Sequence, residues 1–262
     1  MMRLPQTLVA LALCGVLSLC TACSDAPGYP KPGSDVSRPD MELDAHALYK
    51  QNCAGCHGDN GRGGAAIPLN NPAYLAVAGA DNLRTTITRG IPGTLMPAFA
   101  ASSGGMLTDK QVNALVQGIV SAWARPADFS GVPLPSYSAN TQGNATAGHA
   151  AYAVACARCH GTDGAGTKPA ANTNAQQGST SHSIVDPSYL ALVNDQNLRS
   201  IVIAGHLDWN APDWRSYIPG RALSPQQITD IVAWLATHRT SATETSMGVK
   251  RNRPPDSAKE KP

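Results

Sequence analysis

The chain has 262 residues and a formal net charge of +2; 42% of the residues are hydrophobic and 15% are charged. This mixture is too apolar for a disordered chain. It is also too weakly basic to bind nucleic acid through charge, so no nucleic-acid partner is expected. The length suits one large domain or two small ones. With only 2 Phe and 5% aromatic residues, two small domains would have modest side-chain cores, which suggests that another group helps to fill them.

The N-terminus has the pattern of an export signal over residues 1–22. Arg3 precedes an apolar run, Leu8 to Leu19, that is too short for a stable membrane span. The small residues just before Cys23 resemble the cleavage site of bacterial lipoproteins, although Cys20 stands where that class usually has Leu. We therefore expect a lipid on Cys23 that anchors the chain on the periplasmic side of a bacterial membrane. The alternative is an ordinary secretory signal and a soluble periplasmic protein.

Three segments rich in Pro, Gly or polar residues divide the rest of the chain. Residues 23–41 predict an extended tether, residues 126–144 a linker, and residues 240–262 a polar tail. Two domains are therefore expected between them, at 42–125 and 145–239.

The two expected domains are copies of one module. Four motifs recur in the same order in both. They are C-A-G-C-H-G at 53–58 and C-A-R-C-H-G at 156–161, P-A-Y-L at 72–75 and P-S-Y-L at 187–190, N-L-R at 82–84 and at 197–199, and L-T-D-K-Q-V at 107–112 and L-S-P-Q-Q-I at 223–228. The chain is therefore a tandem repeat, and the second copy carries a polar insertion at about 168–183.

Both copies are expected to be all-α. Asp44 is placed to cap a helix that leads into the first C-A-G-C-H-G motif, and Thr108 and Ser224 are placed to cap the last helix of each copy. Apolar residues follow helical spacing in these last helices and in residues 81–90 and 195–205. No run of useful length alternates as a β-strand would.

Each C-x-x-C-H motif is a specific signal for covalent haem attachment. Two thiols on one helical turn reach the two vinyl groups of a haem, and the adjacent His directs its imidazole at the iron. The predicted attachment residues are Cys53, Cys56, Cys156 and Cys159, and the predicted iron ligands are His57 and His160. A zinc site would need four ligands in each copy, a thioredoxin-like pair would need a βαβ setting, and a disulfide between Cys two apart is a poor bridge.

With these motifs the chain resembles the class I cytochrome c family, as a tandem dihaem member, over most of both copies. The resemblance implies that an N-terminal helix crosses a C-terminal helix, and it places Tyr49 and Tyr152 at the crossing. It also implies that loops wrap around two haem c groups. A proline carbonyl near Pro68 or Pro169 would accept the N–H of the axial imidazole.

The sixth iron ligand is expected to differ between the copies. In the first copy, G-T-L-M-P-A-F places Met96 before Pro97, which resembles the axial-methionine loop of the family. A thioether at this position fills the coordination sphere and raises the reduction potential. Met106 is the nearby rival, but it lies at the start of the last helix, where a packing role is ordinary.

In the second copy Ala211 stands where the first copy has Met96, and alanine cannot bind iron. Three outcomes stay open. His206, five residues earlier on the same loop, binds and gives a lower-potential bis-His haem; or the iron is five-coordinate and open to small ligands; or a remote group such as His182 or Met247 folds in.

No cysteine thiolate is left to act as an axial ligand. Cys14 and Cys20 leave with the signal, Cys23 is lipidated or out of reach, and the other four form thioethers. This argues against the dihaem thiosulfate-oxidising enzymes, which use an axial Cys.

The expected function is electron transfer, in which two haems on one chain pass single electrons between respiratory membrane complexes or dehydrogenases and a terminal acceptor. The expected partners are a quinol-oxidising complex, a terminal oxidase or a dehydrogenase, and the chain is either free or a subunit of such a complex. The alternative is an enzyme that activates peroxide or another small ligand at an open second haem. No acid–base pair or nucleophile motif supports this alternative.

Overall fold

The computed structural model describes residues 38–167 and 183–239. Outside them lie Cys23, Pro169, His182 and Met247, and with them the expected signal, most of the tether and the tail. The described residues from Leu43 to Arg239 belong to one compact unit, which holds both copies of the repeat.

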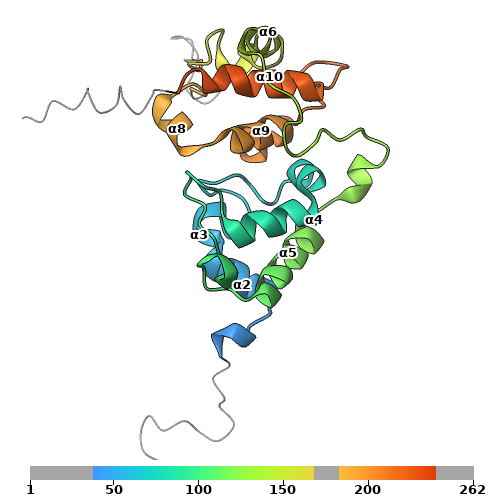
Figure 1. Ribbon diagram of the computed structural model, residues 1–262. Helices are drawn as coiled ribbons and strands as arrows, with labels where there is room; N and C mark the ends of the chain where they lie inside the picture. The colour runs from blue at the N-terminus through green and yellow to red at the C-terminus, as the bar shows by residue number, and fades with distance from the viewer. Residues whose placement is uncertain (1–37, 168–182, 240–262) are drawn as a thin grey trace, which may run out of the picture. The chain divides into compact units, whose positions relative to one another are not determined.

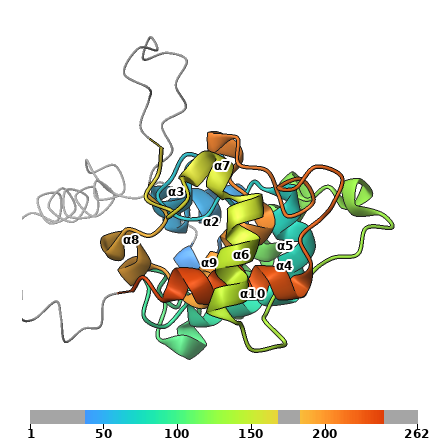
Figure 2. The same cartoon turned by 90° about the horizontal axis from the view of Figure 1, so that it is seen from above.

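The described residues are helical, as predicted, with isolated β-bridges and no strand among them. The first copy contains α2 (Ala45–Asn52), α3 (Ala54–His57), α4 (Pro72–Arg89) and α5 (Asp109–Trp123) (Figure 1). The second contains α6 (Ala145–Ala155), α7 (Ala157–His160), α8 (Pro187–Leu192), α9 (Asp195–Ala204) and α10 (Pro225–Ala236) (Figures 1 and 2). The part of the chain that the structure describes also contains the 3-10 turns η2 (Pro39–Met41), η3 (Ala101–Ser103), η4 (Pro126–Phe129) and η5 (Leu207–Trp209). Helix α4 is kinked at Gly79, where φ is 65°, so its two halves match α8 and α9.

The helices begin where the sequence predicts caps. The Asp44 carboxylate accepts a hydrogen bond from the Ala47 amide at 2.7 Å, which satisfies one of the free N–H groups at the start of α2. Thr108 and Ser224 each form a capping box with a Gln three residues later, at the starts of α5 and α10. These local predictions are therefore confirmed.

In each copy the first helix packs across the last one, α2 on α5 and α6 on α10; Figure 2 shows α6 lying across α10. The two crossings use glycine on opposite helices. A Cβ added to Gly118 in α5 would lie 2.3 Å from the Cβ of Ala45. A Cβ added to Gly148 in α6 would lie 1.9 Å from the carbonyl oxygen of Asp230 and 3.0 Å from the Cβ of Trp234. Each crossing thus needs one residue without a side chain for the two helices to approach.

We expect Gly118→Ala to destabilise the first domain through this contact. Overpacking a tight contact costs ~1–3 kcal/mol, and the better helix propensity of Ala returns about 1 kcal/mol of it. Chemical denaturation of the holoprotein measures the loss. Adding Ala45→Gly removes the opposing methyl and should recover most of the stability, as a double-mutant cycle would report.

Gly55→Ala is the matched control, because a Cβ at Gly55 would meet no atom within 4 Å and the second copy has Arg158 there. Equal effects of Ala at Gly118 and at Gly55 would contradict the packing argument.

Trp123 and Trp234 lie on different turns of the last helices, but each contacts the tyrosine of the first helix in its own copy. Trp123 packs edge-on against Tyr49, with ring centroids 5.2 Å apart. Trp234 packs against Tyr152, with ring centroids 4.2 Å apart. Each copy therefore places an indole against the tyrosine of its first helix, and the resemblance correctly implied that these tyrosines lie at the helix crossing.

The segment that links the copies is fixed by a buried guanidinium. Arg199 in α9 is 2% exposed and donates to the carbonyl oxygens of Ser136 and Tyr137 and to the hydroxyl of Thr229. A buried guanidinium is tolerated only when its donors are satisfied in this way. The stretch around Ser136, which the sequence predicted only as a polar linker, is therefore held against the second copy.

Candidate haem-attachment sites

Both C-x-x-C-H motifs fold as a single helical turn, α3 in the first copy and α7 in the second. The His57 amide donates to the Cys53 carbonyl at 2.9 Å, and the His160 amide donates to the Cys156 carbonyl at 3.0 Å. Two cysteines and a histidine thus lie on one turn in each copy, as haem attachment requires. Cys53 is buried and its partner Cys56 is exposed, and neither forms a disulfide.

A tyrosine hydroxyl forms a hydrogen bond with the end of each of these turns. The Tyr49 hydroxyl donates to the Gly58 carbonyl at 2.8 Å, and the Tyr152 hydroxyl donates to the Gly161 carbonyl. Burial, together with the neighbouring Cys156, raises the pKa of Tyr152 to about 12, so the phenol keeps its proton and stays a donor at neutral pH. The first helix of each copy is thereby tied to the residue that directly follows the histidine of its C-x-x-C-H motif.

His57 is held in the orientation that an iron ligand needs. Its side chain is 7% exposed, and its Nδ1 lies 2.8 Å from the carbonyl oxygen of Ile67. The tautomer that donates from Nδ1 keeps the lone pair of Nε2 for a metal. Burial lowers the pKa of His57, and the bond to Ile67 opposes this only in part. The ring is therefore neutral at pH 7, which is the form that binds iron.

The resemblance implied that a proline carbonyl accepts the hydrogen bond from the histidine ring, and this expectation was wrong for the first copy. The acceptor is Ile67, the residue before Pro68. Pro68 still contributes, because the residue before a proline is restricted to extended conformations, and this fixes the direction of the Ile67 carbonyl. The matching Pro169 lies outside the described residues.

The loop that carries Met96 leaves α4 through Gly90, whose φ is 65°. A Cβ on Gly90 would lie 2.6 Å from the Met96 carbonyl oxygen, so only glycine fits. The Ile91 amide then donates to that same carbonyl at 3.0 Å, and Thr94 Oγ1 accepts from the Met96 amide at 3.2 Å. The backbone of Met96 is thus fixed on both sides, on the loop where the sequence predicts the axial methionine.

The second copy builds the same loop with different side chains. It leaves α9 through Gly205, whose φ is again 65°, and a Cβ there would lie 2.4 Å from the Ala211 carbonyl oxygen. The His206 amide donates to the Ala211 carbonyl at 3.0 Å, and the Ala211 amide donates back to the His206 carbonyl at 3.1 Å. Backbone geometry therefore places Ala211 where the first copy has Met96, and His206 where it has Ile91.

The side chains of Asp208 and Asn71 join the two copies directly, and neither contact was predicted from the sequence. The Asp208 carboxylate, in η5, accepts from Arg62 Nε at 2.8 Å and from the Gly63 amide at 3.0 Å. The carboxamide of Asn71, 1% exposed, donates to the Ala204 carbonyl at 3.1 Å. Comparison of the two copies could not reveal these bonds, because each joins positions that do not match.

Tyr217 was also missed by the sequence analysis. It follows the loop of Ala211, and its pKa is raised above the usual range by burial first and then by the neighbouring Cys156 and Asp213. A half-buried phenol thus lies near Cys156, a predicted attachment residue of the second copy.

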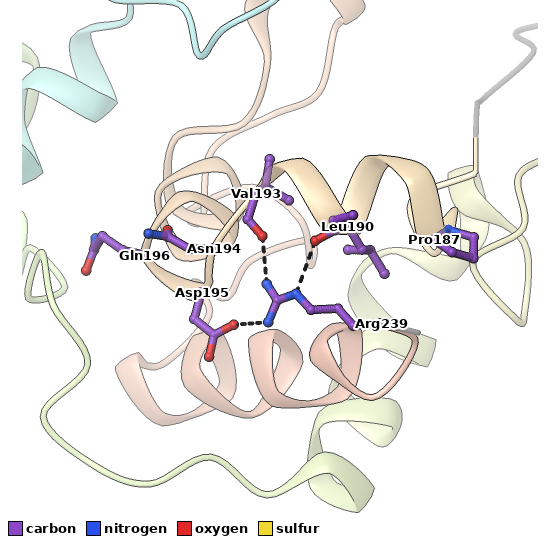
Figure 3. A pocket seen from close by; sticks show the side chains of 8 residues that line it. Pro187, Leu190, Val193, Asn194, Asp195, Gln196 and Arg239 are labelled. Atoms are coloured by element: carbon purple, nitrogen blue, oxygen red, sulfur yellow. Dashed lines mark hydrogen bonds and ion pairs between the residues drawn. The ribbon is translucent and has the colours of Figure 1, made fainter. Parts of the chain in front are cut away.

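A surface hollow beside α8 and α9 belongs to neither attachment site. Figure 3 shows that Arg239 crosses it and donates to the carbonyl oxygens of Leu190 and Val193 while it pairs with Asp195. The guanidinium therefore ties the end of α10 to the turn between α8 and α9, which is a structural role.

Within residues 38–167 and 183–239, no three or more His, Cys, Asp or Glu side chains group as a metal site. In the same part of the chain, no helix is long and apolar enough to cross a membrane.

Comparison with protein families assigns each copy separately. The family described as cytochrome c oxidase, cbb3-type, subunit III matches residues 41–117, and the family described as cytochrome c matches residues 145–239. Each matched segment contains one C-x-x-C-H turn and the loop that follows it, so the internal repeat is a repeat of cytochrome c domains.

Curated relatives match parts of this chain. The cbb3-type cytochrome c oxidase subunit CcoP of Rubrivivax gelatinosus is 32% identical over 149 residues, which cover 56% of this chain and 43% of that protein. CcoP of Azospirillum sp. strain B510 is 25% identical over 191 residues, with 61% of this chain and 60% of that protein covered. The dihydro-heme d1 dehydrogenase of Pseudomonas aeruginosa is 36% identical over 89 residues, or 34% of this chain and 17% of that protein. The match thus spans about half the length of the oxidase subunits.

Two cytochrome c domains, each with the thiols and the histidine of its own motif, imply two covalently bound haem c groups. The residues fit that group, because His57 presents a neutral imidazole whose Nδ1 is already engaged. The chain is therefore a tandem dihaem member of the class I c-type cytochromes.

Proposed function

We propose that the protein transfers single electrons between a respiratory membrane complex or a dehydrogenase and a terminal acceptor. The observation that carries this proposal is the pair of C-x-x-C-H turns, one in each cytochrome c domain of a single chain. Haem c supplies reversible one-electron chemistry when bound. The chain contributes the attachment points, the axial ligands that set the two potentials, and the contacts that hold the two domains together.

Seven side chains have direct roles in this proposal. Cys53 and Cys56 hold the first haem and Cys156 and Cys159 the second, His57 and His160 bind iron, and Met96 is the sixth ligand in the first domain. Their placement on one helical turn, and the fixed backbone of the Met96 loop, support these roles. A thioether ligand raises the potential of a c-type haem, so the first domain is expected to have the higher potential.

The proposed partners are redox proteins of a respiratory chain. The curated relatives named above include subunits of cbb3-type cytochrome c oxidases and a dihydro-heme d1 dehydrogenase. By analogy, this chain serves a terminal oxidase, a quinol-oxidising complex or a dehydrogenase, as a free carrier or as a subunit.

We further propose that the mature chain works on the periplasmic side of a bacterial membrane, anchored by a lipid on Cys23. The support is the pattern of the first 23 residues, in which a basic start and a short apolar run precede small residues and Cys23. Mutation of Cys23 to Ser should release the protein from the membrane fraction into the soluble periplasm. Recovery of the variant in the membrane fraction would contradict the anchor.

Electron transfer can be tested with the dihaem holoprotein and a purified cbb3-type cytochrome c oxidase. The reduced protein is mixed with the oxidase in aerated buffer, and haem oxidation and oxygen consumption are followed together. We expect both haems to be oxidised only when the oxidase is present. Rapid turnover of added hydrogen peroxide by the protein alone, without electron delivery to the oxidase, would favour the enzyme alternative instead.

A further inference from the structure

We propose that His206 is the sixth iron ligand in the second domain and replaces there the methionine that the first domain uses. The inference rests on the proposed function, since it requires a haem on Cys156 and Cys159. It resolves the three possibilities that the sequence left open for this iron.

The backbone pairing of His206 with Ala211 carries the inference. The two residues exchange both of their amide hydrogen bonds, at 3.0 and 3.1 Å, in an isolated antiparallel bridge. Residues that lie directly opposite each other in such a pair project their side chains to the same face, with Cβ atoms about 4.5–5.5 Å apart. The imidazole of His206 therefore leaves the loop on the face of the Ala211 methyl group.

That face is the one from which a ligand is expected in the first domain. Gly90 and Gly205 have the same φ of 65° and make the same close approach to the loop they precede, so Ala211 corresponds to Met96. Each loop carries one ligating side chain across the pair. In the first domain the Ile91 amide donates to the Met96 carbonyl, and in the second the His206 amide makes the same bond to the Ala211 carbonyl.

Protein atoms cover Nδ1 of His206, so Nε2 is the ring nitrogen left to bind iron. Nδ1 is buried and has no hydrogen-bond partner among the described residues. Leaving a buried polar atom without a partner is unfavourable. One face of the imidazole ring stacks on the indole of Trp209, with ring centroids 3.7 Å apart and an angle of 8° between the two ring planes. Trp209 is itself 74% exposed, so the indole covers the imidazole from solvent.

The loop that carries His206 is also held from outside the second domain. Asp208, two residues further on, accepts hydrogen bonds from Arg62 and from the Gly63 amide of the first domain. Asn210 closes η5 in the left-handed conformation, with φ at 54°, which Asn adopts more readily than most residues. A loop fixed at both ends presents its ligand with little loss of conformational freedom on binding iron.

The test uses the full-length dihaem holoprotein, its His206→Ala and His206→Met variants, and Ile91→Ala as the control at the matching position of the first domain. Haem content is measured first, followed by optical and EPR spectra and by carbon monoxide binding to the reduced protein. In the wild type we expect two low-spin haems and no carbon monoxide binding. In His206→Ala, half of the haem should become high-spin and bind carbon monoxide.

His206→Met should restore a six-coordinate second haem and raise its potential, whereas Ile91→Ala should leave both haems unchanged. Carbon monoxide binding to half of the haem in the wild type would overturn the inference, because it would show an open site. A His206→Ala spectrum that stays low-spin would overturn it by pointing to a remote ligand such as His182 or Met247. Fewer than two haems in the wild type would instead contradict the proposed function.

Discussion

Replacing Met96 with Ala should convert the first haem from a six-coordinate, low-spin centre to a five-coordinate one that binds carbon monoxide when reduced. The Met96 backbone is fixed by bonds to Ile91 and Thr94, so the loop should keep its shape when the thioether is removed. Loss of the thioether should also lower the potential of this haem by ~0.1 V or more, a fraction of the roughly 0.8 V range that axial ligands set. Optical spectra and a redox titration would measure both changes.

Met106→Ala is the matched control, because Met106 is 88% exposed and lies beside the start of α5. It should leave the spectrum and both potentials unaltered. If it reproduced the effect of Met96→Ala, Met106 would be the ligand and the assignment of the Met96 loop would be wrong.

Replacing both Cys156 and Cys159 with Ala should yield a chain with one covalent haem instead of two and a second domain with weakened tertiary structure. The helices of that domain are short, and their buried core relies on a few large side chains such as Tyr152 and Trp214. A haem contributes a large share of the apolar area in so small a domain. Hydrogen exchange should therefore show loss of protection in α6 and α10, while α2 and α5 stay protected.

The mirror variant, Cys53→Ala with Cys56→Ala, should lose the other haem and leave the second domain folded. The two variants separate the spectra of the two haems, which makes the potentials of each domain measurable alone. A chain that keeps two covalent haems after loss of Cys156 and Cys159 would refute the assignment of those residues.

Sequence reasoning succeeded where a feature depends on residues close together in the chain. The caps at Asp44, Thr108 and Ser224 each depend on residues within one helical turn, and the structure confirms them. The C-x-x-C-H turns are local in the same sense, and the repeat made them visible twice.

Features that depend on residues far apart were missed or only partly predicted. The sequence showed that Ala211 replaces Met96, but only the paired backbone shows that His206 and Ala211 project to one face. The sequence pointed to the carbonyl of Pro68 as the hydrogen-bond acceptor for His57, but the acceptor is the carbonyl of Ile67. A proline restricts the backbone of the residue before it, so Pro68 directs the Ile67 carbonyl. The bond between Arg62 and Asp208 spans the two copies, and no pattern within either copy signals it.

Two haem c groups should be attached covalently to this chain through its two C-x-x-C-H turns. Intact-mass measurement of the exported protein under denaturing conditions, with thiol alkylation, tests it most directly. We predict a mass that exceeds the mature polypeptide by two haem groups, with Cys53, Cys56, Cys156 and Cys159 all protected from alkylation. A mass without haem, and four alkylated cysteines at these positions, would contradict the account.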